Sequence, residues 1–142
     1  MRRTALLCLL FPLLTACTSV SVQPVARESR LQEVCIQRNP KVAVSDFLMV
    51  LQAGFSRHNI KTRLFDGAKP DDCEYVLNYT ARRTWDIVPY LSQAELTLTR
   101  NMEQVGYAQY HLRGRGGFSL MKWQGTASKI DPVIDRLLAN QW

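Results

Sequence analysis

Apolar and polar residues alternate through the middle of the chain, which is the pattern of strands that bury one face and leave the other in water. The alternation runs through residues 74–87, 94–100 and 105–113, and short turns separate these segments. Consecutive strands with short connections pair with their neighbours in antiparallel fashion. The pattern therefore predicts an antiparallel meander of three strands, with part of a core beneath its apolar face.

Two other segments space their apolar residues by three and four positions, as amphipathic helices do. The first covers residues 44–58 and has Asp46 near its start as a candidate cap, and the second begins at about Thr126. Pro132 suits the second helix if it lies in the first turn, where few backbone donors have intrahelical partners. The apolar positions are Val44, Phe47, Leu48, Leu51 and Phe55 in the first helix and Ala127, Ile130, Val133, Ile134, Leu137 and Leu138 in the second.

Short β-rich runs at residues 33–38 and 60–65 flank the first helix, which therefore crosses over between two strands. The resulting order is β-α-β-β-β-β-α. We predict an α+β fold, a two-layer sandwich in which a mixed, mostly antiparallel sheet carries two helices on one face. Residues 31–142 suit a single domain with one core, and the polar residues 17–30 before it indicate a tether.

The chain begins with a short positive stretch and an uncharged apolar run of ten residues, 5–14. A membrane-spanning helix needs about 20 apolar residues, whereas the apolar part of an export signal needs roughly 7 to 15. The run is too short to span a bilayer and is typical of a signal peptide. We assign this signal peptide to residues 1–16.

The signal ends in Leu14-Thr15-Ala16-Cys17, which resembles the lipobox of bacterial lipoproteins. The resemblance implies that Cys17 is lipidated and becomes a triacylated N-terminus, and two or more acyl chains make a stable membrane anchor. The usual signal for inner-membrane retention is aspartate directly after the cysteine. Because Thr18 stands there, we expect an outer-membrane anchor with the domain facing the periplasm. An ordinary signal peptide with an incidental cysteine is the alternative.

The charge of the chain is mildly positive, with 18 basic and 12 acidic residues, and two of the basic residues leave with the signal peptide. The remaining basic residues are scattered, which is the usual pattern of a solvated surface. No interleaving of aromatic and basic residues typical of an RNA-binding sheet is present. We therefore exclude nucleic acid as a partner.

Cysteine usage follows from the same segments. Cys8 leaves with the signal peptide and Cys17 is lipidated, which leaves Cys35 and Cys73 in an oxidising compartment. We predict that these two residues form a structural disulfide. A redox or metal-binding pair is the alternative, but it favours a closer spacing or neighbouring histidines.

Four segments of the domain resemble a group of uncharacterised small proteobacterial lipoproteins, the Sbal type. They are residues 33–43, 75–85, 94–98 and 129–138. The resemblance covers nearly the whole mature domain and implies no activity. In architecture the chain is also similar to periplasmic accessory lipoproteins that work with envelope transporters and assembly machines, although fold by itself does not determine function.

Two histidines are the candidates for acid-base chemistry, and neither stands in a metal-binding or nucleophile motif. His58 near the end of the first helix is explained as a cap that interacts favourably with the helix dipole. His111 lies on the wet face of its strand, where a small periplasmic hydrolase could pair it with Asp86 or Glu95. We assign no catalytic residue, no metal ligand and no cofactor.

Two candidate binding sites remain. Arg82, Arg83, Trp85 and Tyr90 surround a turn at Pro89 and could bind an envelope protein or a lipid surface, because binding hot spots are enriched in Trp, Tyr and Arg; packing of both aromatic residues in the core is the alternative. The segment 113–117 places two arginines among glycines and could hold a phosphate or lipid headgroup, or serve only as a flexible turn. Its basic residues are Arg113 and Arg115. We favour a non-enzymatic binding or accessory module over the hydrolase.

Overall fold

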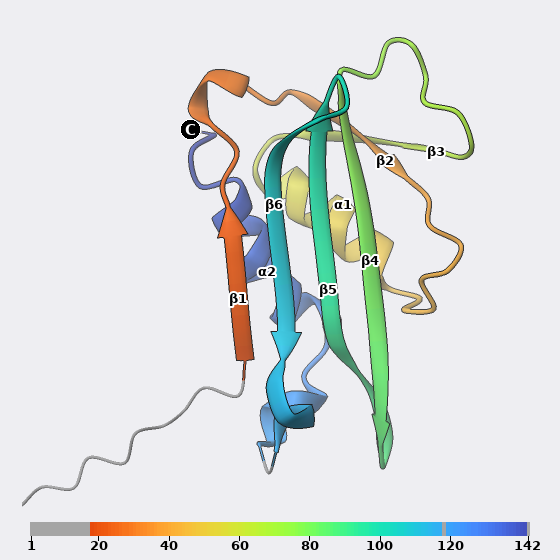
Figure 1. The fold of residues 1–142 in the computed structure, drawn as a ribbon, viewed down its shortest axis with the longest axis vertical. Coiled ribbons are helices and arrows are strands. Elements are labelled where there is room, and N and C mark those ends of the chain that lie inside the picture. Colours follow the sequence, from red (N-terminus) through yellow and green to blue (C-terminus); the bar gives the residue numbers. More distant parts are fainter. Residues whose placement is uncertain (1–17, 118, 142) are drawn as a thin grey trace, which may run out of the picture.

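The computed structural model of the protein describes residues 18–117 and 119–141, in which one sheet packs against two α-helices (Figure 1). The strands are β1 (Thr18–Gln23), β2 (Glu33–Gln37), β3 (Lys61–Phe65), β4 (Tyr75–Asp86), β5 (Val88–Arg100) and β6 (Glu103–Leu112). The α-helices are α1 (Phe47–Arg57) and α2 (Thr126–Leu137), and the short 3-10 helices are η1 (Arg27–Ser29), η2 (Arg113–Gly116) and η3 (Leu120–Trp123).

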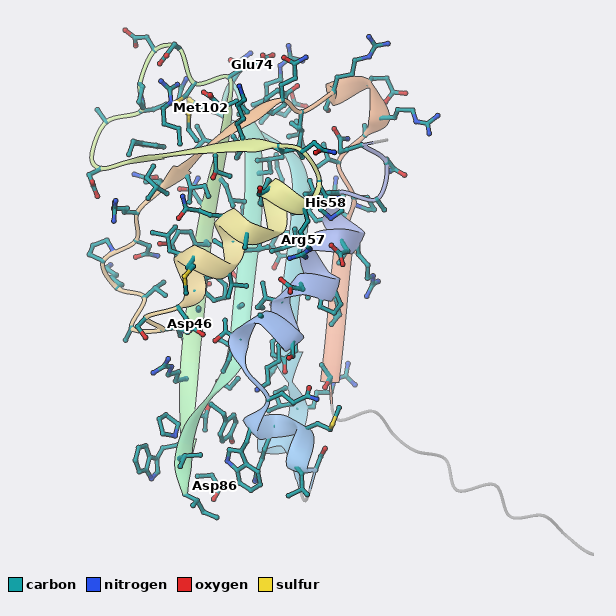
Figure 2. All side chains as sticks on the ribbon, turned by 180° about the vertical axis from the view of Figure 1, so that it is seen from behind. Asp46, Arg57, His58, Glu74, Asp86 and Met102 are labelled. Atoms are coloured by element: carbon teal, nitrogen blue, oxygen red, sulfur yellow. A yellow bond between two sulfur atoms is a disulfide. The ribbon has the colours of Figure 1, made fainter. Side chains whose placement is uncertain are left out.

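The strand order in the sheet is β1-β6-β5-β4-β2-β3. Strands β4, β5 and β6 form the predicted antiparallel meander, and β2 runs parallel to both β3 and β4. Helix α1 crosses over between β2 and β3. Both helices lie on the same face of the sheet (Figures 1 and 2). The predicted α+β class, with a mixed sheet and two packed helices, is confirmed.

Residues 18–23 of the predicted tether form strand β1 of the sheet. It pairs antiparallel with β6, from Thr18 opposite Leu112 to Gln23 opposite Tyr107. Val20 and Val22 pack against the core from this strand, and Val25 just after it is completely buried. Two valines among serines are a weak strand signal, but the pairing satisfies backbone groups of β6 that would otherwise form an open sheet edge.

Both helix starts differ from the expectation. Asp46 is the residue before α1, yet its carboxylate makes no cap and instead accepts a hydrogen bond of 2.9 Å from the Thr126 hydroxyl. Helix α2 begins at Thr126 with Gly125 before it, so Pro132 lies beyond the first turn rather than in it. The Asp46–Thr126 bond joins the starts of the two helices, and it replaces a local cap by a tertiary contact.

The main core lies between the helices and the apolar face of the sheet. Its largest fully buried side chains include Phe47, Leu51 and Phe55 from α1, Ile130, Ile134 and Leu137 from α2, and Leu77, Leu96 and Leu98 from the sheet. The two helices approach closely at Gly54, where an added Cβ would clash with the Cδ1 atom of Ile134. The predicted amphipathic faces therefore meet both the sheet and each other.

The predicted disulfide between Cys35 and Cys73 is present and joins β2 to the loop before β4, with the two Cα atoms 6.0 Å apart. It lies in a second, small apolar cluster with Phe65 and Val76. The Arg63 guanidinium donates to the Cys73 sulfur at 3.2 Å and forms an ion pair with Asp72. The bridge thus closes the end of the sheet where β2, β3 and β4 meet.

A polar clamp joins the end of α1 to α2. Arg57 forms ion pairs with Asp131 and Asp135, and the Nε2 atom of His58 lies 2.7 Å from Asp135 (Figure 2). Burial alone would raise the pKa of the Asp135 carboxyl, but the hydrogen bonds from His58 and Arg57 outweigh it and hold this pKa below its ordinary value. His58 therefore does sit at the end of α1, and its ring is used to bind the second helix.

Candidate binding surface

The β4–β5 hairpin ends in a tight turn centred on Ile87. Strand β4 runs to Asp86 and β5 starts at Val88, so a single residue lies between the paired strands. Ile87 has φ +64°, a left-handed conformation that is costly for a β-branched side chain. The surrounding hairpin holds this strain, and the Ile87 side chain is exposed.

A register shift between Arg82 and Arg83 separates the two predicted cationic residues. The carbonyl of Arg82 accepts a hydrogen bond of 3.2 Å from the Ser92 hydroxyl, and the Arg82 side chain is exposed. The guanidinium of Arg83 lies 3.9 Å from the Asp46 carboxylate on the helix side of the sheet. The two arginines therefore do not form one paired anion site.

The two predicted aromatic anchors have opposite environments. Trp85 is 70% exposed, whereas Tyr90 is only 3% exposed and belongs to the core. The ammonium groups of Lys122 and Lys129 lie 5.9 and 5.5 Å from the centre of the Tyr90 ring. Of the two, only Trp85 is available to a partner, and Tyr90 supports the packing beneath it.

Helix η3 is fixed to the hairpin by polar contacts. The Lys122 ammonium forms an ion pair with the Asp86 carboxylate, and the Trp123 indole N–H donates to the Asp86 carbonyl at 3.2 Å. The Lys129 ammonium, from α2, donates to the backbone carbonyls of Leu91 and Lys122. Burial lowers the pKa of Lys129 to about 8. These bonds make the turn, η3 and the start of α2 one connected end of the molecule.

This end carries exposed apolar side chains that sequence reasoning did not single out. Next to Trp85 the turn exposes Ile87 and Val88, and η3 exposes Leu120 and Met121. Two pairs of adjacent apolar residues in the sequence could have indicated this surface. They are Ile87-Val88 in the predicted turn and Leu120-Met121 in a segment to which the pattern assigned no element. We name these five residues, Trp85, Ile87, Val88, Leu120 and Met121, the tip patch.

The glycine-rich segment forms η2 rather than an open loop. Gly114, Gly116 and Gly117 all have positive φ, and an added Cβ at Gly116 would lie 2.7 Å from the Lys122 Cβ. The Arg113 side chain is exposed, and its guanidinium donates to the Ser19 hydroxyl at 3.4 Å. The side chain of Arg115 lies outside what the structure describes, as do Cys17 and the signal peptide, so the anion site stays a prediction.

His111 is exposed on the open face of the sheet, which is the face that the two α-helices do not cover. It pairs with Ser19 on β1 and with Gln93 on β5. The two carboxylates considered for a hydrolase are engaged elsewhere. Asp86 binds Lys122, and Glu95 accepts a hydrogen bond of 3.0 Å from the Gln109 side chain. Among the described residues, no hydrogen bond or ion pair joins His111 to either carboxylate. Within residues 18–117 and 119–141 no cluster of metal-binding side chains is found.

A polar hollow of about 340 Å³ lies on the open face, where the end of β2 meets β4 and β5. Arg38, Asn39, Asn78 and Glu95 are among its lining residues. Asn39 is fixed there because its amide donates to the Tyr79 carbonyl at 2.9 Å. The hollow is a further candidate site for a polar ligand, separate from the tip patch. His111 is not among its lining residues.

Comparison with known proteins gives a likeness of fold. The chain resembles the PelC dodecamer from Paraburkholderia phytofirmans, with a TM-score of 0.56, 16% identity and coverage of 86% of this chain and 97% of that chain. A dodecamer of a variant of the same PelC matches with a TM-score of 0.53, 15% identity and coverage of 87% and 96%. No protein-family model and no curated protein matches the sequence. The described residues contain no helix of the length and apolar character that a membrane crossing requires.

Proposed function

We propose that this protein is a lipoprotein of the periplasmic face of the outer membrane and acts there as a non-enzymatic binding or accessory module. Cys17 carries the lipid anchor. The observation that carries the proposal is a PelC-like fold that follows directly after a lipobox-like sequence. The Cys35–Cys73 disulfide supports the same compartment, because such bridges persist in oxidising environments.

Self-association is part of this proposal. The similar PelC structures are dodecamers, and β1 and β3 are the two edge strands of the sheet in this chain. An edge strand presents unpaired backbone groups that can pair with another chain. Association between two different patches of identical subunits closes into a ring when the rotation allows it. We therefore propose that the anchored protein works as an oligomer.

The test of the anchor compares Cys17→Ser with Cys8→Ser in cells fed with labelled palmitate. Cys17→Ser removes the only thiol of the lipobox-like sequence, so we expect no label and an unprocessed precursor. Cys8→Ser changes the signal peptide itself and is expected to leave labelling and processing unchanged. Normal labelling of the Cys17→Ser protein would contradict the proposal. If the labelled wild-type protein fractionates with the inner membrane, the proposed location at the outer membrane is wrong.

A further inference from the structure

The exposed apolar residues of this protein are concentrated at one end. Seven large hydrophobic side chains are exposed among the described residues, and five of them form the tip patch. The other two are Met49 on α1 and Met102. Asp86, which marks the hairpin turn, and Met102 lie at opposite ends of the sheet (Figure 2). Single exposed apolar residues are ordinary, but five of them on two segments that Asp86 joins indicate a contact with an apolar phase or partner.

The chain enters the described structure at this same end. Strand β1 starts at its lower end in Figure 1, and the β4–β5 turn also points downward. In the register of the sheet, Thr18 pairs with Leu112, and the neighbouring His111 pairs with Gln93 on β5. Ile87 lies about five residues beyond that level, or roughly 15 Å at the rise of a strand. The turn therefore projects past the residue that follows Cys17.

The chemistry of the patch suits the surface of a bilayer. Tryptophan prefers the boundary between headgroups and acyl chains, and aliphatic side chains gain free energy on leaving water. The acidic group of the turn, Asp86, is engaged by Lys122. Arg82 on β4 and Arg113 on η2 are exposed, and a cation close to a membrane surface is attracted to anionic headgroups.

The conformation of Ile87 supports a role for its side chain outside the fold. A left-handed β-branched residue lowers stability, and glycine would fit this turn without strain. Packing of the Ile87 side chain does not offset this loss of stability, because the residue is 77% exposed. Strain of this kind is typical of functional positions.

We infer that the tip patch docks into the interfacial layer of the lipid bilayer and holds the domain at a defined orientation on the membrane. This inference rests on the proposed anchor at Cys17, which brings the bilayer to this end of the molecule. The lipid holds the protein at the membrane, and the patch decides which end of the sheet faces it. The edge strands and the open polar face then remain directed to the periplasm.

Orientation is tested with the lipidated protein in vesicles of phosphatidylethanolamine and phosphatidylglycerol that contain brominated lipids. Trp123 and Trp142 are replaced by Phe, so that Trp85 is the only fluorescent indole. In the matched control Trp85 is also replaced by Phe, and Met102→Trp places the reporter at the other end. We expect bromine to quench Trp85 several-fold more than the indole at position 102. Equal quenching of the two reporters would overturn the inference.

The affinity of the tip patch itself for the bilayer is tested without the lipid anchor. The protein used is the mature chain with Cys17→Ser, exported by an ordinary signal peptide. Removing one or two inserted apolar side chains is expected to weaken partition into the same vesicles by about tenfold. Ile87→Gly is the decisive variant, because it deletes the side chain and relieves the strain, so the protein melts at a higher temperature while binding falls. Met102→Ser is the control and is expected to leave binding unchanged. Unchanged partition of the Ile87→Gly protein would overturn the inference.

The two proposals can fail separately. Mass spectrometry of the purified protein reports acylation at Cys17 whatever the tip patch does. If the patch joins two copies of this chain instead, Ile87→Gly would lower the oligomeric mass in solution and leave vesicle binding unchanged, which would also overturn the membrane inference.

Discussion

Lys129 is a buried lysine whose surroundings change its chemistry. It is 6% exposed, and its ammonium is held by two backbone carbonyls and faces the Tyr90 ring. Burial lowers its pKa from 10.5 to about 8. Tyr90 and the ion pair of Lys122 with Asp86 lie beside it, so this lysine joins α2 to the end of the molecule that carries the tip patch.

Lys129→Met is expected to change the dependence of stability on pH. Between about pH 8 and pH 10.5 the unfolded chain binds the Lys129 proton more strongly than the folded chain does. The free energy of unfolding contributed by this residue therefore rises with pH across that window, by at most about 1.4 kcal/mol per unit, and is constant below it. Chemical denaturation at a series of pH values is the measurement.

The comparison for this prediction is Lys41→Met at an exposed position. We expect the wild-type protein to gain more stability over Lys129→Met than over Lys41→Met as the pH rises from 8 to 10.5. Parallel pH profiles of all three proteins would show that Lys129 titrates normally.

At the scale of elements, β1 depends on a close contact that no strand pattern reveals. An added Cβ at Gly106 of β6 would lie 2.7 Å from the Val25 Cγ2 atom and 3.1 Å from the Leu137 Cδ1 atom. Val25 also donates its backbone N–H to the Leu137 carbonyl at 2.9 Å. Gly106 thus leaves room for the segment after β1 to pack between β6 and the end of α2.

Gly106→Ala is expected to destabilise the protein by about 1 to 3 kcal/mol, because the new methyl group overpacks a junction of buried residues. The matched control is Gly125→Ala, where the space around the new methyl group is open and φ is −60°. Thermal unfolding followed by circular dichroism distinguishes them. A Gly106→Ala protein that melts with the control would mean that Val25 moves aside at little cost.

Some elements of the fold could be predicted from sequence patterns, and others could not. The meander followed from the alternation of residues such as Leu77 and Tyr79, because a strand of period two needs only one apolar face to be recognised. The Cys35–Cys73 bridge followed from elimination in an oxidising compartment. The split between Trp85 and Tyr90 could not be predicted, since a register shift in the hairpin and the contacts of η3 decide which ring is buried.

At the scale of the whole molecule, the open edges of the sheet predict association. We expect the mature chain with Cys17→Ser to show a native mass that is a multiple of the monomer mass. Ser21→Lys adds a charge to the exposed edge strand β1 and is expected to lower that mass, because edge charges oppose strand addition. Thr80→Lys, exposed on the inner strand β4, is the control.

Native mass spectrometry and light scattering give the result for these three proteins. A wild-type mass of one chain would contradict self-association. An oligomer that survives Ser21→Lys and dissociates with Thr80→Lys would place the contact on the open face of the sheet instead of at its edge.

Local patterns in the chain were sufficient for the class of fold and the meander, because each depends on spacing or on the pairing of near neighbours. The disulfide followed from the cysteine count, and the signal peptide and lipobox-like sequence stay predictions. Only the tertiary structure showed that β1 joins the sheet and that Lys129 and Tyr90 are buried. It also placed the exposed side chains of Trp85, Ile87 and Leu120 at one end of the molecule. These features join segments far apart in the chain, and their free energy depends on contacts that no local window contains. The same packing brings the start of β1 and the tip patch to one end of the sheet.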